Sequence, residues 1–335
     1  MGKADNAALD FFSARERFAD LMNFSFFAGK RVIKGEDLEA TDSVFVARQR
    51  RHKKTRLDRV IVDKAMLWRG GCLRLLIQEY QSYIDYRMVF RCMYAESLAY
   101  HKQWKDKKHR HMLEKDLASG NEYLSGIKKD EKFIPVITLV VNLSKEKWDG
   151  ERTLYGMLKE GCDDSILPWI SDYRMNVLDY HDYESLDAFS TDVKNVFEIL
   201  KRMDDQSEIT ELLEKDQTYK ELEDDTADLI EILTDMKIGN GEGGKRDMCK
   251  AWIDQKEAGI KEGKEQGIKE GIEEGKKQGI KEGKAEDILD LLTDIGTVAA
   301  DLKTKILSET NLDILKRWLK LAAKSDSIEA FTSAM

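Results

Sequence analysis

Two apolar runs separated by a glycine turn constrain the fold of this chain more than any other feature. The runs are residues 60–68 and 72–77, both rich in β-branched and aliphatic side chains, and Arg69-Gly70-Gly71 lies between them. Such runs around a glycine turn are typical of adjacent antiparallel strands. We therefore expect a β-hairpin here, with the rest of the N-terminal part organised around it.

Acidic side chains lie toward the outer ends of this predicted hairpin. Asp58 and Asp63 lie along the first strand, Glu79 closes the second, and Gln81 follows on the same face of an extended chain. Carboxylates brought together at a sheet edge suit Mg²⁺ or Mn²⁺, which bind one or two protein carboxylates and keep several waters. The pattern predicts a metal site, although acidic residues near strand ends are more often simply solvated.

The flanking segments extend this pattern in a defined order. Glu79-Tyr80-Gln81 is followed by Asp85, Tyr86, Met88, Arg91, Tyr94, Tyr100 and Gln103; residues 16–23 and 32–42 precede the hairpin, and residues 123–126, 133–139 and 148–150 come later. This ordered set covers most of residues 10–205. Together with a glycine repeat near the C-terminus, it resembles the recombination-promoting nuclease family, a transposase-like branch of the PD-(D/E)XK nuclease superfamily.

The resemblance implies an α/β fold in which a PD-(D/E)XK nuclease-like central mixed sheet is flanked by helices. It implies that Asp58 or Asp63 binds a divalent metal together with Glu79, while Gln81 replaces an orienting lysine common in the superfamily. The implied activity is hydrolysis of DNA, with Mg²⁺ or Mn²⁺ as cofactor and a link to recombination or mobile elements.

The choice between the two aspartates is open. The family usually places an Arg-Asp pair ahead of the hairpin, which Arg56 and Asp58 fit, whereas Asp63 fits the distance to the turn and to Trp68. The aspartates are five residues apart, so in an unbroken strand they point to opposite faces and only one can face Glu79. We favour Asp58 and keep Asp63 as the alternative.

Basic residues are clustered, although the net charge of −9 argues against a protein that simply coats nucleic acid. One run precedes the hairpin and a second follows the signature: Arg48, Arg50, Arg51, Lys53, Lys54 and Arg56, then Lys102, Lys105, Lys107, Lys108 and Arg110. Each run alone is more often a solvated surface. Bracketing one metal site, they predict DNA phosphate contacts from Arg51, Lys53, Lys54, Arg56 and Lys105. Arg91 is a further candidate, for a phosphate or for Glu79, with pairing to Asp85 or Glu96 as the alternative.

Hydrophobic periodicity divides the chain into five parts. Helices are expected at 7–23, from 83 onward and at 186–203, 209–222 and 226–236, and strands at 133–141 and 174–180. The predicted parts are a nuclease-like domain (1–205), an acidic helical extension (206–236), a flexible linker (237–257), a glycine-repeat helix (258–285) and a small helical region (286–335). Together they predict an α/β domain followed by an all-helical extension.

Seven glycines recur every fourth residue in the C-terminal part. They are Gly259, Gly263, Gly267, Gly271, Gly275, Gly279 and Gly283. In an isolated helix each glycine costs about 0.8–1.0 kcal/mol relative to alanine. The repeat therefore predicts either a homo-oligomer or a docked partner, brought close along the smooth stripe, or a charged and partly helical tether.

Several function classes lack support. No run of 18 apolar residues and no signal peptide occur, so we expect a cytoplasmic protein without a membrane partner. The cysteines, Cys72, Cys92, Cys162 and Cys249, form no CxxC pair and are expected to be reduced. His109 and His111 resemble surface residues rather than ligands. The GxSxG motif of serine hydrolases and the dinucleotide-binding GxGxxG motif after a strand are also missing.

Three functions compete. The first is a divalent-metal-dependent DNA endonuclease of low sequence specificity, since phosphate contacts carry no sequence information. The second is a catalytically inactive DNA-binding or regulatory relative. The third is an oligomerisation or interaction protein built on the glycine-repeat helix.

Overall fold

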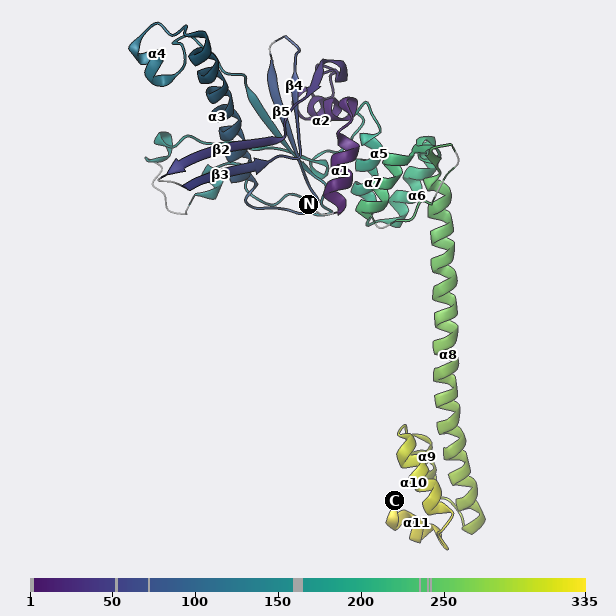
Figure 1. The fold of residues 1–335 in the computed structure, drawn as a ribbon. Coiled ribbons are helices and arrows are strands. Elements are labelled where there is room, and N and C mark those ends of the chain that lie inside the picture. The colour runs from purple at the N-terminus through teal and green to yellow at the C-terminus, as the bar shows by residue number, and fades with distance from the viewer. Residues whose placement is uncertain are drawn as a thin grey trace. The chain divides into compact units, whose positions relative to one another are not determined.

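A mixed sheet lies at the centre of the N-terminal part of the protein (Figure 1). The computed structural model describes residues 3–51, 54–71, 73–158, 165–234, 236–239, 241 and 243–335. Within these ranges the side chains are described everywhere except at residues 46–51 and 54–59. The chain divides into two units, residues 1–252 and 253–335. All strands of the described residues belong to the first unit, so the predicted α/β organisation followed by a helical C-terminal region is confirmed.

The central sheet has five strands in the order β1-β4-β5-β6-β7. Their bounds are Leu38–Ala40 (β1), Lys64–Trp68 (β4), Arg74–Gln81 (β5), Val136–Asn142 (β6) and Asn176–Asp179 (β7). Strands β1, β4 and β5 pair antiparallel, while β5, β6 and β7 pair parallel. The predicted hairpin is β4 and β5, and Gly71 in its turn has a φ of +73°, which glycine adopts without strain.

Strand β6 matches the prediction for residues 133–141. It begins directly after Pro135, whose carbonyl accepts the Leu75 N–H at 2.9 Å. Because β6 pairs with a strand on each side and helices cover both faces, its side chains are almost all buried. This explains the continuous apolar run, which is typical of a parallel strand covered on both sides.

The first strand of the predicted hairpin is interrupted. Residues Lys54–Ile61 form β3, which pairs with β2 (Val44–Arg51) in a separate two-stranded ribbon. The chain leaves β3 at Val62, whose N–H donates to the Ser43 carbonyl at 2.9 Å and whose side chain is buried, and β4 begins only at Lys64. The assumption of one unbroken strand was therefore wrong.

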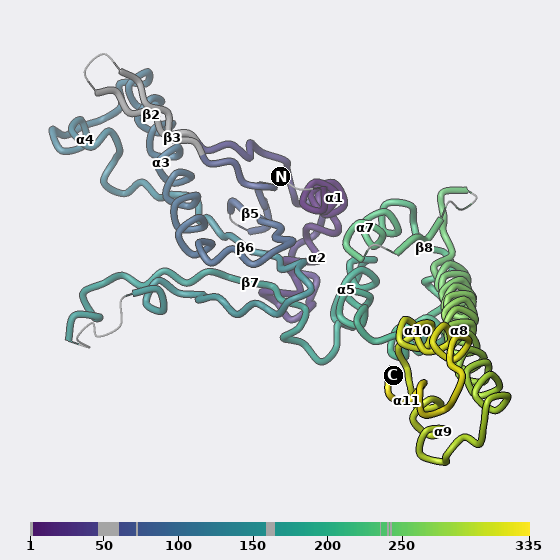
Figure 2. The backbone as a smooth tube through the Cα atoms, turned by 90° about the horizontal axis from the view of Figure 1, so that it is seen from below, coloured from purple at the N-terminus to yellow at the C-terminus, as the bar shows by residue number. Residues whose placement is uncertain are grey.

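Helices cover the two faces of the sheet (Figure 2). Leu76 and Tyr80 of β5 pack in one core with α1 (Lys3–Phe12), α2 (Arg15–Phe27), α5 (Val193–Arg202), α6 (Gln206–Lys215) and α7 (Asp224–Thr234). The alternate residues of β5 and β6 face α3 (Met88–Glu114). Since α6 and α7 share the core of the sheet, the predicted boundary at residue 205 is not a break in packing.

The single helix predicted at 7–23 is two helices. Helix α1 ends at Phe12, and Ala14 has extended backbone angles before α2 begins at Arg15. Arg17 then fixes α2 against two other helices. Its Nε and Nη2 lie 2.7 and 2.5 Å from the Asp192 carboxylate, its Nη1 lies 2.5 Å from Asp225, and its guanidinium lies 3.9 Å above the Phe11 ring.

We expect Arg17→Ala to lower the free energy of unfolding by about 2 kcal/mol, mainly because it leaves the partly buried Asp192 carboxylate without its cation, while the pair with the more exposed Asp225 contributes little. Thermal or urea unfolding measures this. Arg31→Ala is the matched control, since the Arg31–Glu16 pair at 3.1 Å is solvent-exposed on both sides and is worth about 1 kcal/mol at most. Equal losses in the two variants would contradict the assigned role of Arg17.

The predicted linker is partly ordered into secondary structure. Strands β8 (Leu222–Glu223) and β9 (Lys245–Arg246) pair, and buried Arg246 forms ion pairs with Asp224, Asp228 and Glu231. Helix α8 then runs without a break from Met248 to Ile295, so the expectation of a flexible linker was wrong from residue 248 onward.

The second unit is helical throughout its described regular structure. The end of α8 packs with α9 (Ala300–Leu307), α10 (Leu312–Ala322) and α11 (Ile328–Ala334) around a small apolar core that includes Leu292, Leu315 and Trp318. The remaining α-helix of the described residues, α4 (Gly120–Ser125), belongs to the first unit and follows α3. No helix among the described residues is long and apolar enough to span a membrane.

Candidate functional site

Asp63, and not Asp58, lies beside Glu79. Strand β4 pairs with β5 in the register Lys64↔Gln78, and continuing this register by one residue places Asp63 opposite Glu79. The chain bends there, and the Asp63 carboxylate accepts the Tyr80 N–H at 2.8 Å in place of a backbone partner. Two acidic residues from neighbouring strands therefore meet at the end of β4 and β5.

Asp58 belongs to a different part of the fold. It lies on β3, where its backbone pairs with Ala47 in the two-stranded ribbon. The preference for Asp58 is therefore corrected to Asp63. The reason is the interruption at Val62, which ends β3 and lets Asp63 return to the central sheet independently of the residues before it.

Both carboxyl groups have raised pKa values, and burial is the main cause for each. Glu79 is only 4% exposed, and burial first, then the nearby Asp63 charge, raises its pKa to about 8, with Arg91 acting in the opposite direction. Burial also raises the pKa of Asp63, opposed by the hydrogen bond from Tyr80 N–H and by Arg91. Near neutral pH the pair therefore holds a proton that a cation would displace.

Arg91 on α3 bridges two acids of this site. Its Nη2 lies 3.1 Å from Glu79 Oε2 and its Nη1 lies 3.4 Å from Asp85 Oδ2. Asp85 also accepts the Arg87 backbone N–H at 2.9 Å, and its pKa lies below the usual value because Arg87 and Arg91 outweigh its burial. Of the partners weighed for Arg91, Glu79 and Asp85 are both contacted, and the carboxyl of Glu96 bonds Tyr173 instead.

Gln81 lies on the face of β5 that carries Glu79, as the two-residue spacing predicts. Its side chain is buried, and its Nε2 donates to the Tyr80 carbonyl at 3.0 Å. The site thus brings together Asp63, Glu79, Gln81 and Arg91 from three elements. Sequence reasoning did not assign Asp85 to it, and the available signal was its position six residues before Arg91, at the start of the turn into α3.

The predicted phosphate-binding residues are not all near this site. Arg51, Lys54 and Arg56 lie on the β2–β3 ribbon with their side chains outside the described set, and Lys53 lies outside the described residues altogether. Lys105 is on α3, 14 residues beyond Arg91, which corresponds to about 21 Å along the helix axis. Only Arg91 therefore touches the carboxylates among the candidates whose side chains are described.

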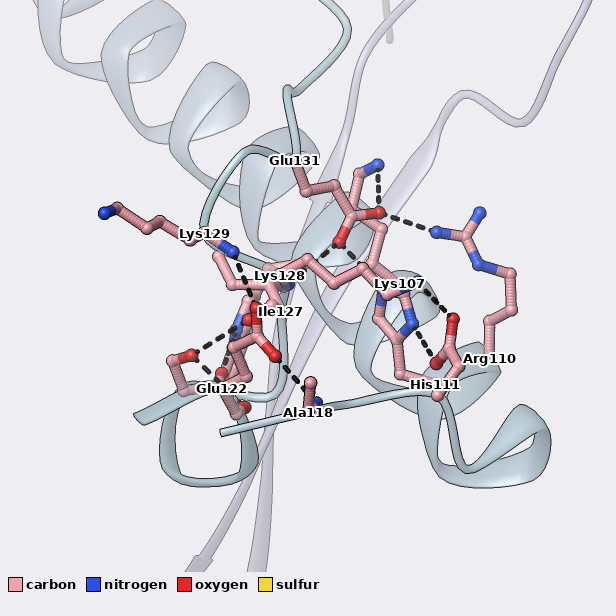
Figure 3. Close-up of polar contacts among 12 residues, drawn as sticks. Lys107, Arg110, His111, Ala118, Glu122, Ile127, Lys128, Lys129 and Glu131 are labelled. Atoms are coloured by element: carbon pink, nitrogen blue, oxygen red, sulfur yellow. Dashed lines mark hydrogen bonds and ion pairs between the residues drawn. The ribbon is translucent and has the colours of Figure 1, made fainter. Parts of the chain in front are cut away.

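A second polar cluster lies at the far end of α3 (Figure 3). His111, Glu114 and Asp116 each offer one potential metal-ligand atom, and these atoms lie within 4.8 Å of one another. Among the described residues, no other group of three or more His, Cys, Asp or Glu side chains is this close together. The two ring nitrogens of His111 are, however, already within 2.7 and 2.8 Å of Asp116 and Glu131. The expectation that His111 is a surface residue was wrong, since it is 3% exposed.

Three cations complete this cluster. Lys107 and Arg110 lie 2.9 and 2.6 Å from Glu131, and Lys128 lies 2.6 Å from Asp116 (Figure 3). Such a cationic setting disfavours a dication and suits an ion-pair network between α3 and the following loops. Hydrogen bonds to Glu131 and Asp116 raise the pKa of His111, so the protonated ring joins the lysine and arginine side chains as a cation of the network.

This arrangement predicts a pH-dependent stability. The pKa of His111 is higher in the folded protein than in the unfolded chain, where it is about 6.5. Protonated His111 therefore stabilises the fold fully at pH values below about 6.5, and this stabilisation is lost as pH rises through the pKa of the folded protein. Asp116 and Glu131, with pKa values lowered to about 2, stay ionised throughout this range. We expect the melting temperature of His111→Gln to lie below that of the wild type at pH 6 and to approach it by pH 9. A difference that widens with pH would contradict this.

Comparison of the chain with protein-family models, with curated proteins and with solved structures found no match.

Proposed function

We propose that this protein is a divalent-metal-dependent DNA endonuclease with a PD-(D/E)XK nuclease-like site. The observation that carries the proposal is the meeting of Asp63 and Glu79 at the end of a hairpin in a mixed sheet, with Gln81 on the same face. This is the arrangement that the resemblance to the recombination-promoting nuclease family implies, with Asp63 in the place of Asp58. The link to recombination or mobile elements rests on that resemblance.

The donor set fits a hard dication. Asp63 and Glu79 offer carboxylate oxygens, and each has a pKa raised mainly by burial, to which the Asp63 charge adds at Glu79 and the Asp5 charge adds at Asp63. Mg²⁺ or Mn²⁺ prefers such oxygen ligands and would relieve the repulsion between the two charges. When bound, the metal ion would activate a water molecule and stabilise charge on the scissile phosphate.

The remaining side chains position and balance this pair. Arg91 lies 3.1 Å from Glu79 and lowers the pKa of that carboxyl, and on binding of a dication at Glu79 its guanidinium could turn to a DNA phosphate. Gln81 carries no charge, so it serves as an orienting group and not as a proton acceptor. Contacts to phosphates carry no base information, which accounts for the proposed low sequence specificity.

The test is nicking of supercoiled plasmid DNA by the purified full-length chain in Mg²⁺ or Mn²⁺. Cleavage that requires the metal and disappears in Glu79→Ala supports the proposal. DNA binding without cleavage by either protein would instead identify a catalytically inactive DNA-binding relative.

A specific feature of α8 supports a second proposed property, self-association. At each of the seven repeat glycines an added Cβ would meet no atom within 4 Å, so none of the described residues packs against the smooth stripe. Four isoleucines between the glycines, Ile260, Ile268, Ile272 and Ile280, are 41–67% exposed. A second copy of residues 258–285 would cover both features and offset the cost of the glycines.

A further inference from the structure

The outward side of α3 carries aromatic rings that no part of the fold covers fully. Phe90 and Tyr94 are 44% and 43% exposed and lie four residues apart, so they share one side of the helix and are separated by about 6 Å along its axis. A single exposed ring is common on protein surfaces, whereas neighbouring exposed rings that form a continuous patch more often belong to a binding site.

The two rings flank Arg91 in the sequence of α3, with Phe90 about 100° and Tyr94 about 60° away from Arg91 around the helix. Phe90 is adjacent in sequence to Arg91, whose guanidinium contacts Glu79 and Asp85 at 3.1 and 3.4 Å, and Tyr94 lies one turn further along. A polymer that contacts Arg91 beside Glu79 and runs along α3 would meet Tyr94 within the next turn, with Phe90 one turn before Tyr94 on the same side.

The same side of the helix continues with basic groups. His101 and Lys108 follow Phe90 by 11 and 18 residues, close to three and five whole turns, and Lys105 follows Tyr94 by 11 residues. We call this series, Phe90, Tyr94, His101, Lys105 and Lys108, the α3 stripe. Lys108 Nζ also lies 5.3 Å above the ring of Trp104, another aromatic residue of this helix.

The acidic residues of α3 lie off the stripe. Glu96, Asp106 and Glu114 follow Phe90 by 6, 16 and 24 residues, which places them about 120–160° away around the helix. With six basic and three acidic residues, α3 has a net charge of +3 in a chain of net charge −9. The stripe therefore offers rings and positive charge together, which matches an anionic polymer with exposed flat groups.

We propose that the α3 stripe binds single-stranded DNA, with Phe90 and Tyr94 stacking against unpaired bases and Lys105 and Lys108 contacting phosphates. The inference rests on the proposed nuclease function and names its substrate class, which is DNA with an unpaired stretch at the carboxylate site. In a duplex the base faces are hidden within the stack, so exposed rings would gain little there. A single strand presents a base face to each ring without that cost.

The test measures binding apart from cleavage. Fluorescence anisotropy of a labelled 20-nucleotide oligothymidine and of a duplex of the same length would be recorded in EDTA with the full-length chain. Phe90→Ala/Tyr94→Ala is expected to weaken single-strand binding about 100-fold, or about tenfold for each lost ring. Tyr94→Phe keeps the ring and should bind as the wild type does.

Phe26→Ala is the matched control, because Phe26 is also an exposed ring, 37% exposed, but lies on α2, which packs on the other face of the sheet from α3. It should leave single-strand binding unchanged. Far-ultraviolet circular dichroism verifies that the double variant is folded, and Phe90→Leu/Tyr94→Leu, which retains apolar bulk without a ring, should lose affinity in the same way.

The outcomes separate this inference from the nuclease proposal. Duplex binding as tight as single-strand binding, or single-strand binding that survives loss of both rings, overturns the role of the stripe even if plasmid DNA is nicked. Capture of a second copy of the chain or of an acidic protein by the stripe in place of DNA would overturn it as well. Ring-dependent single-strand binding without any cleavage in Mg²⁺ or Mn²⁺ would support the stripe and reject the nuclease.

Discussion

Asp63→Asn is expected to lower Mg²⁺-dependent nicking of plasmid DNA at least about 100-fold, as Glu79→Ala should. The change replaces the Asp63 carboxylate by an amide and so removes a negatively charged metal ligand. Asp63 lies just before β4 and opposite Glu79 of β5. A loss of this size corresponds to about 3 kcal/mol of transition-state stabilisation. The initial rate of nicking at fixed metal concentration measures it.

Asp58→Asn is the matched control, because it makes the same chemical change five residues earlier. Asp58 lies on β3, where its backbone pairs with Ala47 in the two-stranded ribbon and not in the central sheet. The nicking rate of the Asp58→Asn variant should therefore stay within about twofold of the wild-type rate. Asparagine at 63 still offers an oxygen to the Tyr80 N–H, so the fold should survive, which a melting curve verifies. A lost rate in Asp58→Asn with a normal rate in Asp63→Asn would reverse the assignment.

The second large effect is a rise of activity with pH. Because the pKa of Glu79 is about 8 and metal binding needs the ionised carboxylate, the rate at subsaturating Mg²⁺ should increase about tenfold per pH unit up to that value and then level off. Arg91 lowers this pKa, so Arg91→Gln should move the rise to higher pH. Rates measured between pH 6 and 9.5 for both proteins test the sign of the shift.

The same pKa has a consequence for stability. A folded pKa above the unfolded value of about 4.3 means that the stability from protonated Glu79 is present at low pH and is lost as pH rises toward 8. Mg²⁺ should then raise the melting temperature more at pH 8.5 than at pH 6.5, because it binds the form that is otherwise disfavoured. A rate profile that is flat or falls with pH, or a metal effect on melting that is greater at pH 6.5, would contradict the role of Glu79.

Local patterns in the sequence were sufficient for several elements of the secondary structure, but they missed strands β1 and β2. The hairpin around Gly70-Gly71, the buried strand after Pro135 and the helix that includes Val196 and Phe197 all follow from side-chain periodicity and turn residues, which act between close neighbours. The position of Gln81 on the Glu79 face follows from the two-residue repeat of a strand in the same way.

The errors occurred where distant segments decide the outcome. Helix α1 and helix α2 separate at Ala14, and Arg17 in the first turn of α2 is held by Asp192 and Asp225, which lie 175 and 208 residues away. The burial of His111 depends on Glu131 from a later loop. No periodicity in the surrounding residues contains this information, because ion pairs between distant segments form only after the chain has folded.

The sequence by itself determined that a strand ending in Glu79-Tyr80-Gln81 pairs with an acid-bearing strand before it, since strand propensity and turn chemistry are local properties. Only the tertiary structure decided which aspartate meets Glu79. The physical reason is that the β2–β3 ribbon takes Asp58 into its own pairing, and the bend at Val62 and Asp63 then resets which side chains face the central sheet.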